Sequence, residues 1–335
     1  MSISPTASHA RAAKTSAATR FNVTFAATLA GLTAAFALML ACLQRLDSLP
    51  PPPFTATTCI DEKLKFLSEQ PLQRIDLIAV GSSVTWRNLD MAAFQEAGLA
   101  HHPLNAAPCY LHASETTFLT SFLLNRMPRV QTVVTVVAPR DFEACRTPSD
   151  EFFSKRLAEA YIFNGLPALP VYLANFKPQD FARDALRIRA MRTDPQHPLS
   201  LSMDAFGSGP LHRSGDWLPP PALEEACFPA LTALEATVKQ HGGRLVVAAF
   251  PMEAEWRRRF DPDGAIQAAF EARLQQALVE SETTFLSGDH PALRDLVHAD
   301  AVHLLWESAR SYSRSMAERL ASSNGIANSP SNGRR

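Results

Sequence analysis

The sequence predicts an α/β fold, a doubly wound and mainly parallel sheet flanked by helices, with an N-terminal transmembrane helix and a helical insertion. Three observations support this prediction. Short apolar runs without polar alternation are typical of parallel strands buried on both faces. Longer amphipathic segments separate these runs, as right-handed β-α-β crossovers require. Near the N-terminus, residues 21–43 contain no charged side chain.

Residues 21–43 are expected to form a membrane anchor. As a helix they would reach about 34 Å, at about 1.5 Å per residue, whereas a bilayer core is about 30 Å thick. Residues 1–20 carry Arg11, Lys14 and Arg20 and no acidic residue. The positive-inside rule therefore places residues 1–20 in the cytoplasm. We expect a single-pass protein of a bacterial inner membrane, with its catalytic domain periplasmic or otherwise extracytoplasmic.

A cleaved leader is the alternative to an uncleaved anchor. Residues 39–42 loosely resemble a lipoprotein processing site, with Cys42 as the lipidated residue. Leu40 is bulky where such sites have a small residue, which favours the uncleaved anchor. In either case the remaining cysteines would lie outside the cytoplasm and could oxidise. Their pairing stays open, and the cysteines concerned are Cys59, Cys109, Cys145 and Cys227.

The rest of the chain is divided by composition. Residues 44–70 are expected to be a proline-rich linker and domain entry, residues 71–322 the α/β domain, and residues 323–335 a disordered tail. Within the domain, residues 150–220 break the alternation and are interpreted as a helical insertion beside the active site. The predicted strands are residues 75–80, 130–137 and 245–250, with weaker candidates at 103–107 and 283–286; the predicted helices include residues 111–127 and 222–240.

Composition excludes some classes of function. The 32 basic and 33 acidic side chains nearly cancel, and no dense basic run follows the N-terminus, so nucleic acid is not an expected partner. The cysteines and histidines show no close clustering, so no metal site is predicted, and no cofactor is implied either.

Candidate catalytic residues are sought just after the predicted strands, because ligands of doubly wound sheets bind at the carboxyl ends of the strands. Gly81-Ser82-Ser83 follows the first strand, and Ser83 there can be an exposed nucleophile. By itself the motif is equally compatible with a turn or a helix cap. A base is available in His303, which follows Asp300 by three residues and precedes an amphipathic helix. His298 is the alternative base.

The order of these motifs resembles the SGNH (GDSL-like) hydrolases over residues 75–320. The resemblance implies a catalytic triad of Ser83, Asp300 and His303, with Ser82 at the place where the family usually has Asp. A Gly-Ser-Ser form is similar to membrane-tethered members of cell-envelope acyl transfer, including the D-alanyl transfer protein of teichoic acids.

The resemblance also implies an oxyanion hole. Its donors would be the backbone N–H group of Ser83 and that of Ala106 or Ala107, one of which replaces the family's glycine, together with Asn105, which matches the family's second block. After the strand at 130–137 the family has an Asn, and this chain has Arg140. Arg140 is therefore expected either to replace that Asn as an oxyanion donor or to form a salt bridge with Asp141 or Glu143.

The function implied is that of a serine ester hydrolase or O-acyltransferase working through an acyl-serine intermediate. Its expected substrate is an acylated envelope polysaccharide, most simply one that carries O-acetyl groups. One alternative is a lipolytic esterase acting on lipid esters. Another is a catalytically impaired scaffold that binds glycan or a membrane acyltransferase.

Overall fold

The computed structural model describes residues 17–145, 151–215 and 219–323, and the chain divides into two units, residues 1–49 and residues 50–335. The expectations for most of the cytoplasmic segment and for nearly all of the C-terminal tail lie outside the described residues. The two units are treated separately below.

The first unit is dominated by one helix, α1, which covers Ala17–Arg45. Its 29 residues contain the uncharged stretch 21–43, and large apolar side chains such as Phe25, Leu29 and Leu32 are exposed along it. Within the described part of the chain, this helix alone is long and apolar enough to cross a membrane.

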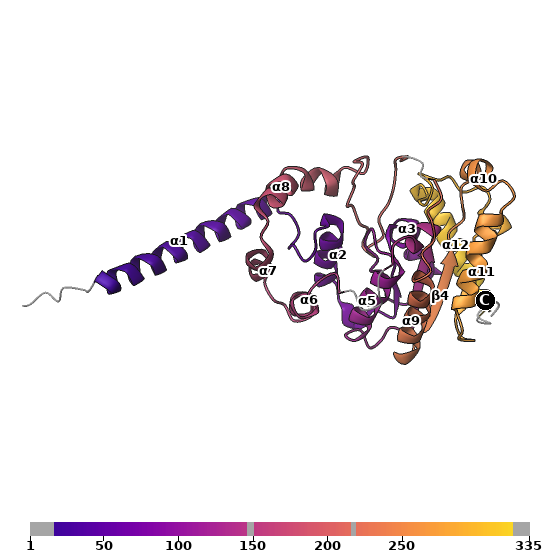
Figure 1. Ribbon diagram of the computed structural model, residues 1–335, viewed down its shortest axis with the longest axis horizontal. Helices are drawn as coiled ribbons and strands as arrows, with labels where there is room; N and C mark the ends of the chain where they lie inside the picture. The colour runs from indigo at the N-terminus through magenta and orange to yellow at the C-terminus, as the bar shows by residue number, and fades with distance from the viewer. Residues whose placement is uncertain (1–16, 146–150, 216–218, 324–335) are drawn as a thin grey trace, which may run out of the picture. The chain divides into compact units, whose positions relative to one another are not determined.

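The second unit is built on a five-stranded parallel sheet with strand order β2-β1-β3-β4-β5 (Figure 1). All five predicted strands are present. The two strands predicted from the weakest signals, at residues 103–107 and 283–286, are the edge strands of the sheet, where fewer apolar residues are needed than in the centre. The strands are β1 (Leu77–Ala79), β2 (Pro103–Asn105), β3 (Thr132–Val137), β4 (Arg244–Ala249) and β5 (Thr284–Leu286).

Helices cover both faces of the sheet, which confirms the predicted layering. Along β3, Val133 and Val137 join one core, and Val134 and Val136 join the other, because successive side chains point to opposite faces. The first core is closed by α5 (Ala113–Leu124), α9 (Cys227–Gln240) and α11 (Ala265–Ala277), and the second by α3 (Ser83–Asn88), α4 (Ala92–Glu96) and α12 (Trp306–Ser323).

The segment between β3 and β4 departs from simple alternation. It contains the short 3₁₀ helix η2 (Pro139–Phe142) and the helices α6 (Lys155–Ile162), α7 (Ala168–Asn175) and α8 (Pro178–Thr193). Figure 1 shows these three α-helices beside α2 (Thr58–Ser68), at the opposite end of the domain from α10 (Ala254–Phe260). Ile188 and Met191 of α8 are buried in the same core as Leu64 of α2. The remaining elements are the short 3₁₀ helices η1 (Leu72–Arg74) and η3 (Pro291–Leu293).

Two disulfides settle the cysteine pairing that composition left open. Cys59 of α2 is bonded to Cys109, which follows β2, with 6.2 Å between their Cα atoms. Cys145 is bonded to Cys227 at the start of α9, with a Cα–Cα distance of 5.1 Å. Cys42 is exposed and unpaired. The first disulfide ties the domain entry to the end of a strand, and the second ties the segment after η2 to the helix layer.

Candidate active site

The candidate site lies at the point in the sheet where the order in which the chain adds strands reverses. From β1 the chain passes to β2 on one side and then returns to β3 on the other, so the loops after β1 and β3 diverge. Such a point leaves a crevice beyond the carboxyl ends of the strands. Ser83 follows β1 at this crevice, as the sequence predicts.

The turn after β1 depends on Gly81. Its φ of +148° lies in a region that side-chain-bearing residues rarely adopt, and a Cβ there would come within 2.2 Å of Thr85 Oγ1. Thr85 occupies that space because its hydroxyl donates to Val136 O at 2.9 Å and accepts from Val136 N at 3.0 Å. This pair of bonds joins the helix that carries Ser83 to strand β3.

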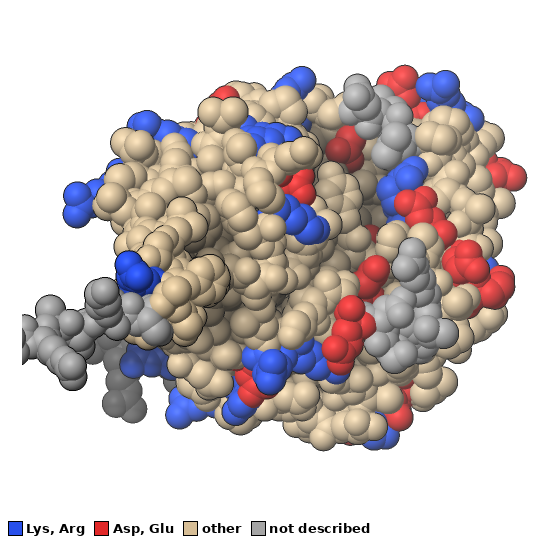
Figure 2. All heavy atoms as spheres, turned by 60° about the vertical axis from the view of Figure 1, so that its left-hand side comes forward, with Lys and Arg blue, Asp and Glu red and all other residues tan. Residues whose placement is uncertain are grey.

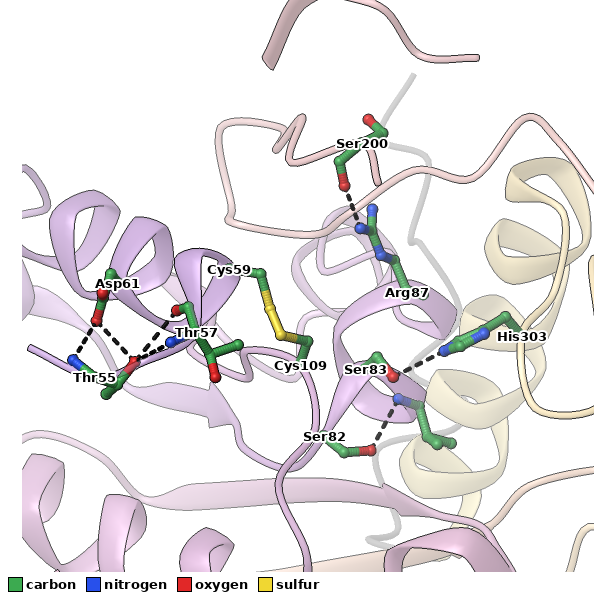
Figure 3. Close-up of a disulfide and its surroundings, with 11 residues drawn as sticks. Thr55, Thr57, Cys59, Asp61, Ser82, Ser83, Arg87, Cys109, Ser200 and His303 are labelled. Carbon is green, nitrogen blue, oxygen red and sulfur yellow. Dashed lines mark hydrogen bonds between the residues drawn. A yellow bond between two sulfur atoms is a disulfide. The ribbon is translucent and has the colours of Figure 1, made fainter. Parts of the chain in front are cut away.

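Ser83, His303 and Asp300 form one chain of hydrogen bonds. The Ser83 Oγ atom lies 2.9 Å from His303 Nε2 (Figure 3), and Nδ1 of the same ring lies 2.8 Å from Asp300 Oδ2. Because an ionised Asp only accepts, Nδ1 carries the proton and Nε2 offers its lone pair to the serine hydroxyl. The arrangement is that of a nucleophile, a general base and an orienting carboxylate.

Asp300 is held as a carboxylate. Its Oδ1 accepts the backbone N–H groups of Val302 at 2.9 Å and His303 at 3.0 Å. Burial alone would raise the pKa of Asp300, but these bonds, the side-chain bond to His303 and the charge of its imidazolium hold the pKa below its ordinary value. The carboxylate is thus ionised and placed to stabilise a protonated His303.

Asn88 connects the loop of His303 to the helix of Ser83. Its side chain is fully buried at the end of α3. Its Nδ2 donates to Val302 O at 2.9 Å, and its Oδ1 accepts from Leu304 N at 2.7 Å. These two bonds flank His303 on either side, so the amide of Asn88 sets the distance between the base and the nucleophile.

The neighbouring Ser82 has a different role. Its Oγ accepts from Val84 N at 3.0 Å, which caps α3 (Figure 3), and its hydroxyl hydrogen-bonds with Asp141. Burial raises the pKa of Asp141 to about 6, against the lowering effect of that bond from Ser82. Of the two serines, it is the hydroxyl of Ser83 that turns toward His303.

The alternative base, His298, faces two carbonyl groups. Its Nε2 lies 2.8 Å from Pro251 O, its Nδ1 lies 3.2 Å from Leu296 O, and its ring packs edge-on against Phe250. Burial lowers the pKa of His298. These contacts describe a structural histidine beside β4.

The oxyanion donors expected after β2 are engaged elsewhere. The N–H of Ala106 donates to Ala79 O at 2.8 Å and extends the pairing of β2 with β1. The Nδ2 of Asn105 donates to Thr85 O at 3.3 Å and Trp86 O at 3.2 Å, within the helix of Ser83. The expectation that these groups face the oxyanion is therefore corrected: the sheet ladder uses one donor, and Asn105 supports α3 with the other.

Arg140 is engaged as well. Its guanidinium pairs with Glu143 at 3.1 Å and donates to Pro219 O at 2.9 Å. Of the two expectations for this residue, the geometry matches the salt bridge with Glu143. What remains for an oxyanion is the N–H of Ser83, which lies in the first turn of α3, where an N–H has no partner within the helix.

A cleft of about 430 Å³ opens beside Ser83 and His303. Its walls come from the start of α2, the disulfide Cys59–Cys109 and Tyr110, helix α8, and the irregular segment 198–211. The side chains mix hydroxyl and guanidinium groups with apolar ones; they include Thr57, Thr58, Arg183, Arg187, Met191, Leu199, Ser200 and Leu211. A cleft of this size suits a small organic ligand.

Trp86 and Arg87, which follow Ser83 on α3, both line the cleft and hold its wall. The guanidinium of Arg87 lies 3.6 Å from the centre of the Trp86 ring and donates to Gly209 O at 3.2 Å and to Ser200 O (Figure 3). Burial lowers the pKa of Arg87 to about 9. Gly209 has no room for a Cβ, which would lie 2.6 Å from Trp86.

Surface charge adds little to this picture. On the face shown in Figure 2, Lys and Arg side chains form small separate groups among neutral surface and acidic residues. Within the described ranges, no group of three or more His, Cys, Asp or Glu side chains is arranged to hold a metal ion.

Two of the residues in this site were missed by the sequence analysis. Asn88 lies on α3, five residues after Ser83, and its bonding partners are more than 200 residues away along the chain. Tyr110 follows Cys109 beyond the end of β2, and the disulfide Cys59–Cys109 beside it forms part of the cleft wall. Neither residue belongs to a motif, so the sequence held no signal for them.

Comparison with known proteins adds no relative: no family model matches the chain, and a search of curated proteins finds no match.

Proposed function

We propose that the protein is an extracytoplasmic, membrane-anchored serine esterase or O-acyltransferase that acts on acylated envelope polysaccharide. The observation that carries the proposal is the hydrogen-bond chain from Ser83 to His303 to Asp300 at the carboxyl end of β1. Ser83 and the Asp300–His303 pair, about 220 residues apart in the sequence, meet there with the distances that nucleophilic acyl transfer requires.

The reaction would proceed in two halves. His303 Nε2 removes the hydroxyl proton as Ser83 Oγ bonds to the ester carbonyl carbon, and the carbonyl electrons move to oxygen. The tetrahedral intermediate then collapses, breaking the bond to the sugar oxygen, which takes the proton from His303. Water or an acceptor hydroxyl next gives its proton to His303 and bonds to the acyl carbon, and Ser83 leaves with that proton.

Each group has a distinct electrostatic task in this scheme. The carboxylate of Asp300 stabilises the imidazolium that forms in both halves, and its lowered pKa keeps it charged. The N–H of Ser83 would donate to the developing oxyanion, a contact that typically contributes about 10²- to 10³-fold in rate.

The location of the domain is supported by two features. The helix α1 is long and apolar enough to span a bilayer, and the positive charge before it favours a cytoplasmic N-terminus. The disulfides Cys59–Cys109 and Cys145–Cys227 are typical of an oxidising compartment. A C-terminal alkaline phosphatase fusion tests this topology, and activity from a cytoplasmic reporter alone would contradict it.

The enzymatic proposal is tested with a fluorophosphonate probe on the full-length chain in detergent. Wild type should label, and His303→Ala should label far more slowly, because the proton of Ser83 then has no acceptor. His298→Ala is the matched control and should label at close to the wild-type rate. Acetyl release from acetylated glycans supports the polysaccharide substrate, and release of fatty acid alone would point to the lipolytic alternative. Absence of labelling in wild type would leave the scaffold alternative.

A further inference from the structure

Tyr110 has an unfavourable backbone conformation. Its φ of +58° lies in the left-handed region, and apart from glycines only Asp47 shares a positive φ among the described residues. A side chain with a Cβ costs roughly 1–2 kcal/mol in this region. Residues held in such conformations gather at ligand clamps and active sites.

Burial of the aromatic ring does not offset this cost. The side chain of Tyr110 is 69% exposed, whereas the large aromatic side chains of the domain core are buried. Its hydroxyl makes no hydrogen bond within the described part of the chain. An exposed ring on a strained backbone contributes little to the stability of the fold itself.

Tyr110 is held in place by the residues before it. Cys109 is buried and bonded to Cys59 of α2, and Ala107 N donates to Asn105 Oδ1 at 3.2 Å. The backbone that leads into Tyr110 is thus fixed at two points. Tyr110 lines the cleft together with Ser83 and His303, and in Figure 3 the disulfide lies on the other side of Ser83 from His303.

We propose that Tyr110 is a stacking platform for a pyranose ring of the substrate, positioned by the disulfide Cys59–Cys109. The proposal rests on the acyl chemistry assigned to Ser83 and names the residue that would select a sugar ester. The exposed face of Tyr110 would cover the apolar C–H face of the ring.

The remainder of the cleft fits the polar edges of a sugar. The cleft is also lined by Thr57 and Thr58, which directly precede Cys59, and by Arg183 and Arg187 of α8. The Nε of Arg187 is buried and has no hydrogen-bond partner, although its Nη2 pairs with Asp184 at 2.8 Å. A sugar hydroxyl oxygen can accept from this Nε, whereas a long acyl chain would leave it without a partner.

The test compares two esters on the full-length protein in detergent: acetylated cello-oligosaccharide and p-nitrophenyl acetate, which has no sugar ring. The measured quantity is the ratio of kcat/KM for the glycan ester to kcat/KM for the small ester. In Tyr110→Asn, a residue that tolerates the left-handed region, this ratio should fall at least tenfold. Tyr110→Phe, which keeps the ring, should preserve the ratio.

The control is Leu173→Asn, which trims another exposed apolar side chain, on α7 and outside the cleft. It should leave the ratio unchanged. Thermal melting provides a second readout: Tyr110→Asn should melt at or above the wild-type temperature, because strain is relieved and little buried surface is lost. If Tyr110 only supported the fold, Tyr110→Asn would melt at a lower temperature than wild type, and kcat/KM would fall equally for both esters. That result would overturn the proposal.

Calorimetry with the same oligosaccharide separates the two proposals. If wild type neither labels with fluorophosphonate nor cleaves either ester, yet binds the glycan and loses at least tenfold in affinity in Tyr110→Asn, the acyl chemistry fails and the platform stands. If wild type cleaves the small ester and the glycan neither binds nor reacts, the platform fails and the acyl chemistry stands.

Discussion

Replacing Asn88 by Ala should allow His303, the base, to move away from Ser83, the nucleophile. The amide of Asn88 is the direct link between α3, which begins with Ser83, and the loop on either side of His303. Ala removes both hydrogen bonds and fills none of the space. The loop of His303 is then free to move relative to Ser83, while the triad side chains themselves are unchanged.

The size of the effect follows from the contacts. The change leaves Leu304 N, which is fully buried, and Val302 O without their partner, at a cost of about 1–3 kcal/mol each. We therefore expect the free energy of unfolding to fall by about 2–6 kcal/mol. A displacement near 1 Å at a catalytic group can lower a rate by about 10²-fold. The labelling rate of Ser83 should fall by about 10- to 100-fold.

The assay measures the fluorophosphonate labelling rate of the folded protein and chemical unfolding on the same samples. Ser313→Ala is the matched control. Ser313 Oγ accepts from Asp90 N at 2.8 Å and lies 2.8 Å from Ala309 O and 3.4 Å from the backbone O of Asn88. Its removal leaves both side-chain hydrogen bonds of Asn88 to the His303 loop in place. Ser313→Ala should lose about 1–3 kcal/mol of stability and label at close to the wild-type rate. Equal labelling rates in Asn88→Ala and Ser313→Ala would refute the positioning role of Asn88.

Asn88→Asp refines the same test. One oxygen can still accept from Leu304 N, but the other faces Val302 O, which repels a carboxylate and accepts a bond from a protonated carboxyl. Burial favours the protonated form, so the pKa of the new acid would be raised in the folded state. The folded state then binds more protons than the unfolded state as pH rises above about 4, and stability falls with pH. Asn88→Asp should therefore be less stable at pH 8 than at pH 5, relative to wild type.

Three further predictions follow from the site. Ser83→Ala should abolish fluorophosphonate labelling and Ser82→Ala should retain most of it; the reverse pattern would move the nucleophile to Ser82. Arg140→Ala should lower the free energy of unfolding by about 1 kcal/mol or less, because the partly exposed pair with Glu143 is lost, and should leave turnover within about threefold of wild type. A loss of turnover of about 10²-fold that Arg140→Asn restores would instead show that Arg140 donates to the oxyanion. Asp300 has a lowered pKa in the folded state, so its contribution to stability is present above its ordinary pKa and disappears as pH falls through the lowered value. Between pH 7 and pH 3 the free energy of unfolding should therefore fall less in Asp300→Asn than in wild type. Equal losses in the two proteins would contradict the assigned ion pair.

The fold class could be predicted from the sequence because parallel strands buried on both faces must be apolar along their whole length. Apart from Thr132, Thr135 and Arg244, the residues of β3 and β4 are apolar, and these strands were located to within about two residues. The edge strands β2 and β5 have only three residues each and gave weaker signals. The order β2-β1-β3-β4-β5 is a property of the assembled sheet.

The sequence by itself determined the candidates for the nucleophile and the base, because Gly81-Ser82-Ser83 must follow a strand and Asp300 lies three residues before His303. Choosing Ser83 over Ser82, and His303 over His298, required the directions of their side chains, which depend on the packing of α3 and α12 against β3. The positions of Ala106 and Arg140 after their strands were also predicted. Whether the backbone N–H of Ala106 and the guanidinium of Arg140 are free to bind an oxyanion could not be predicted. That depends on partners such as Ala79 O and Glu143, which folding supplies. A hydrogen-bond donor binds the nearest suitable acceptor in space, and that acceptor is fixed only when the sheet and its helices have packed.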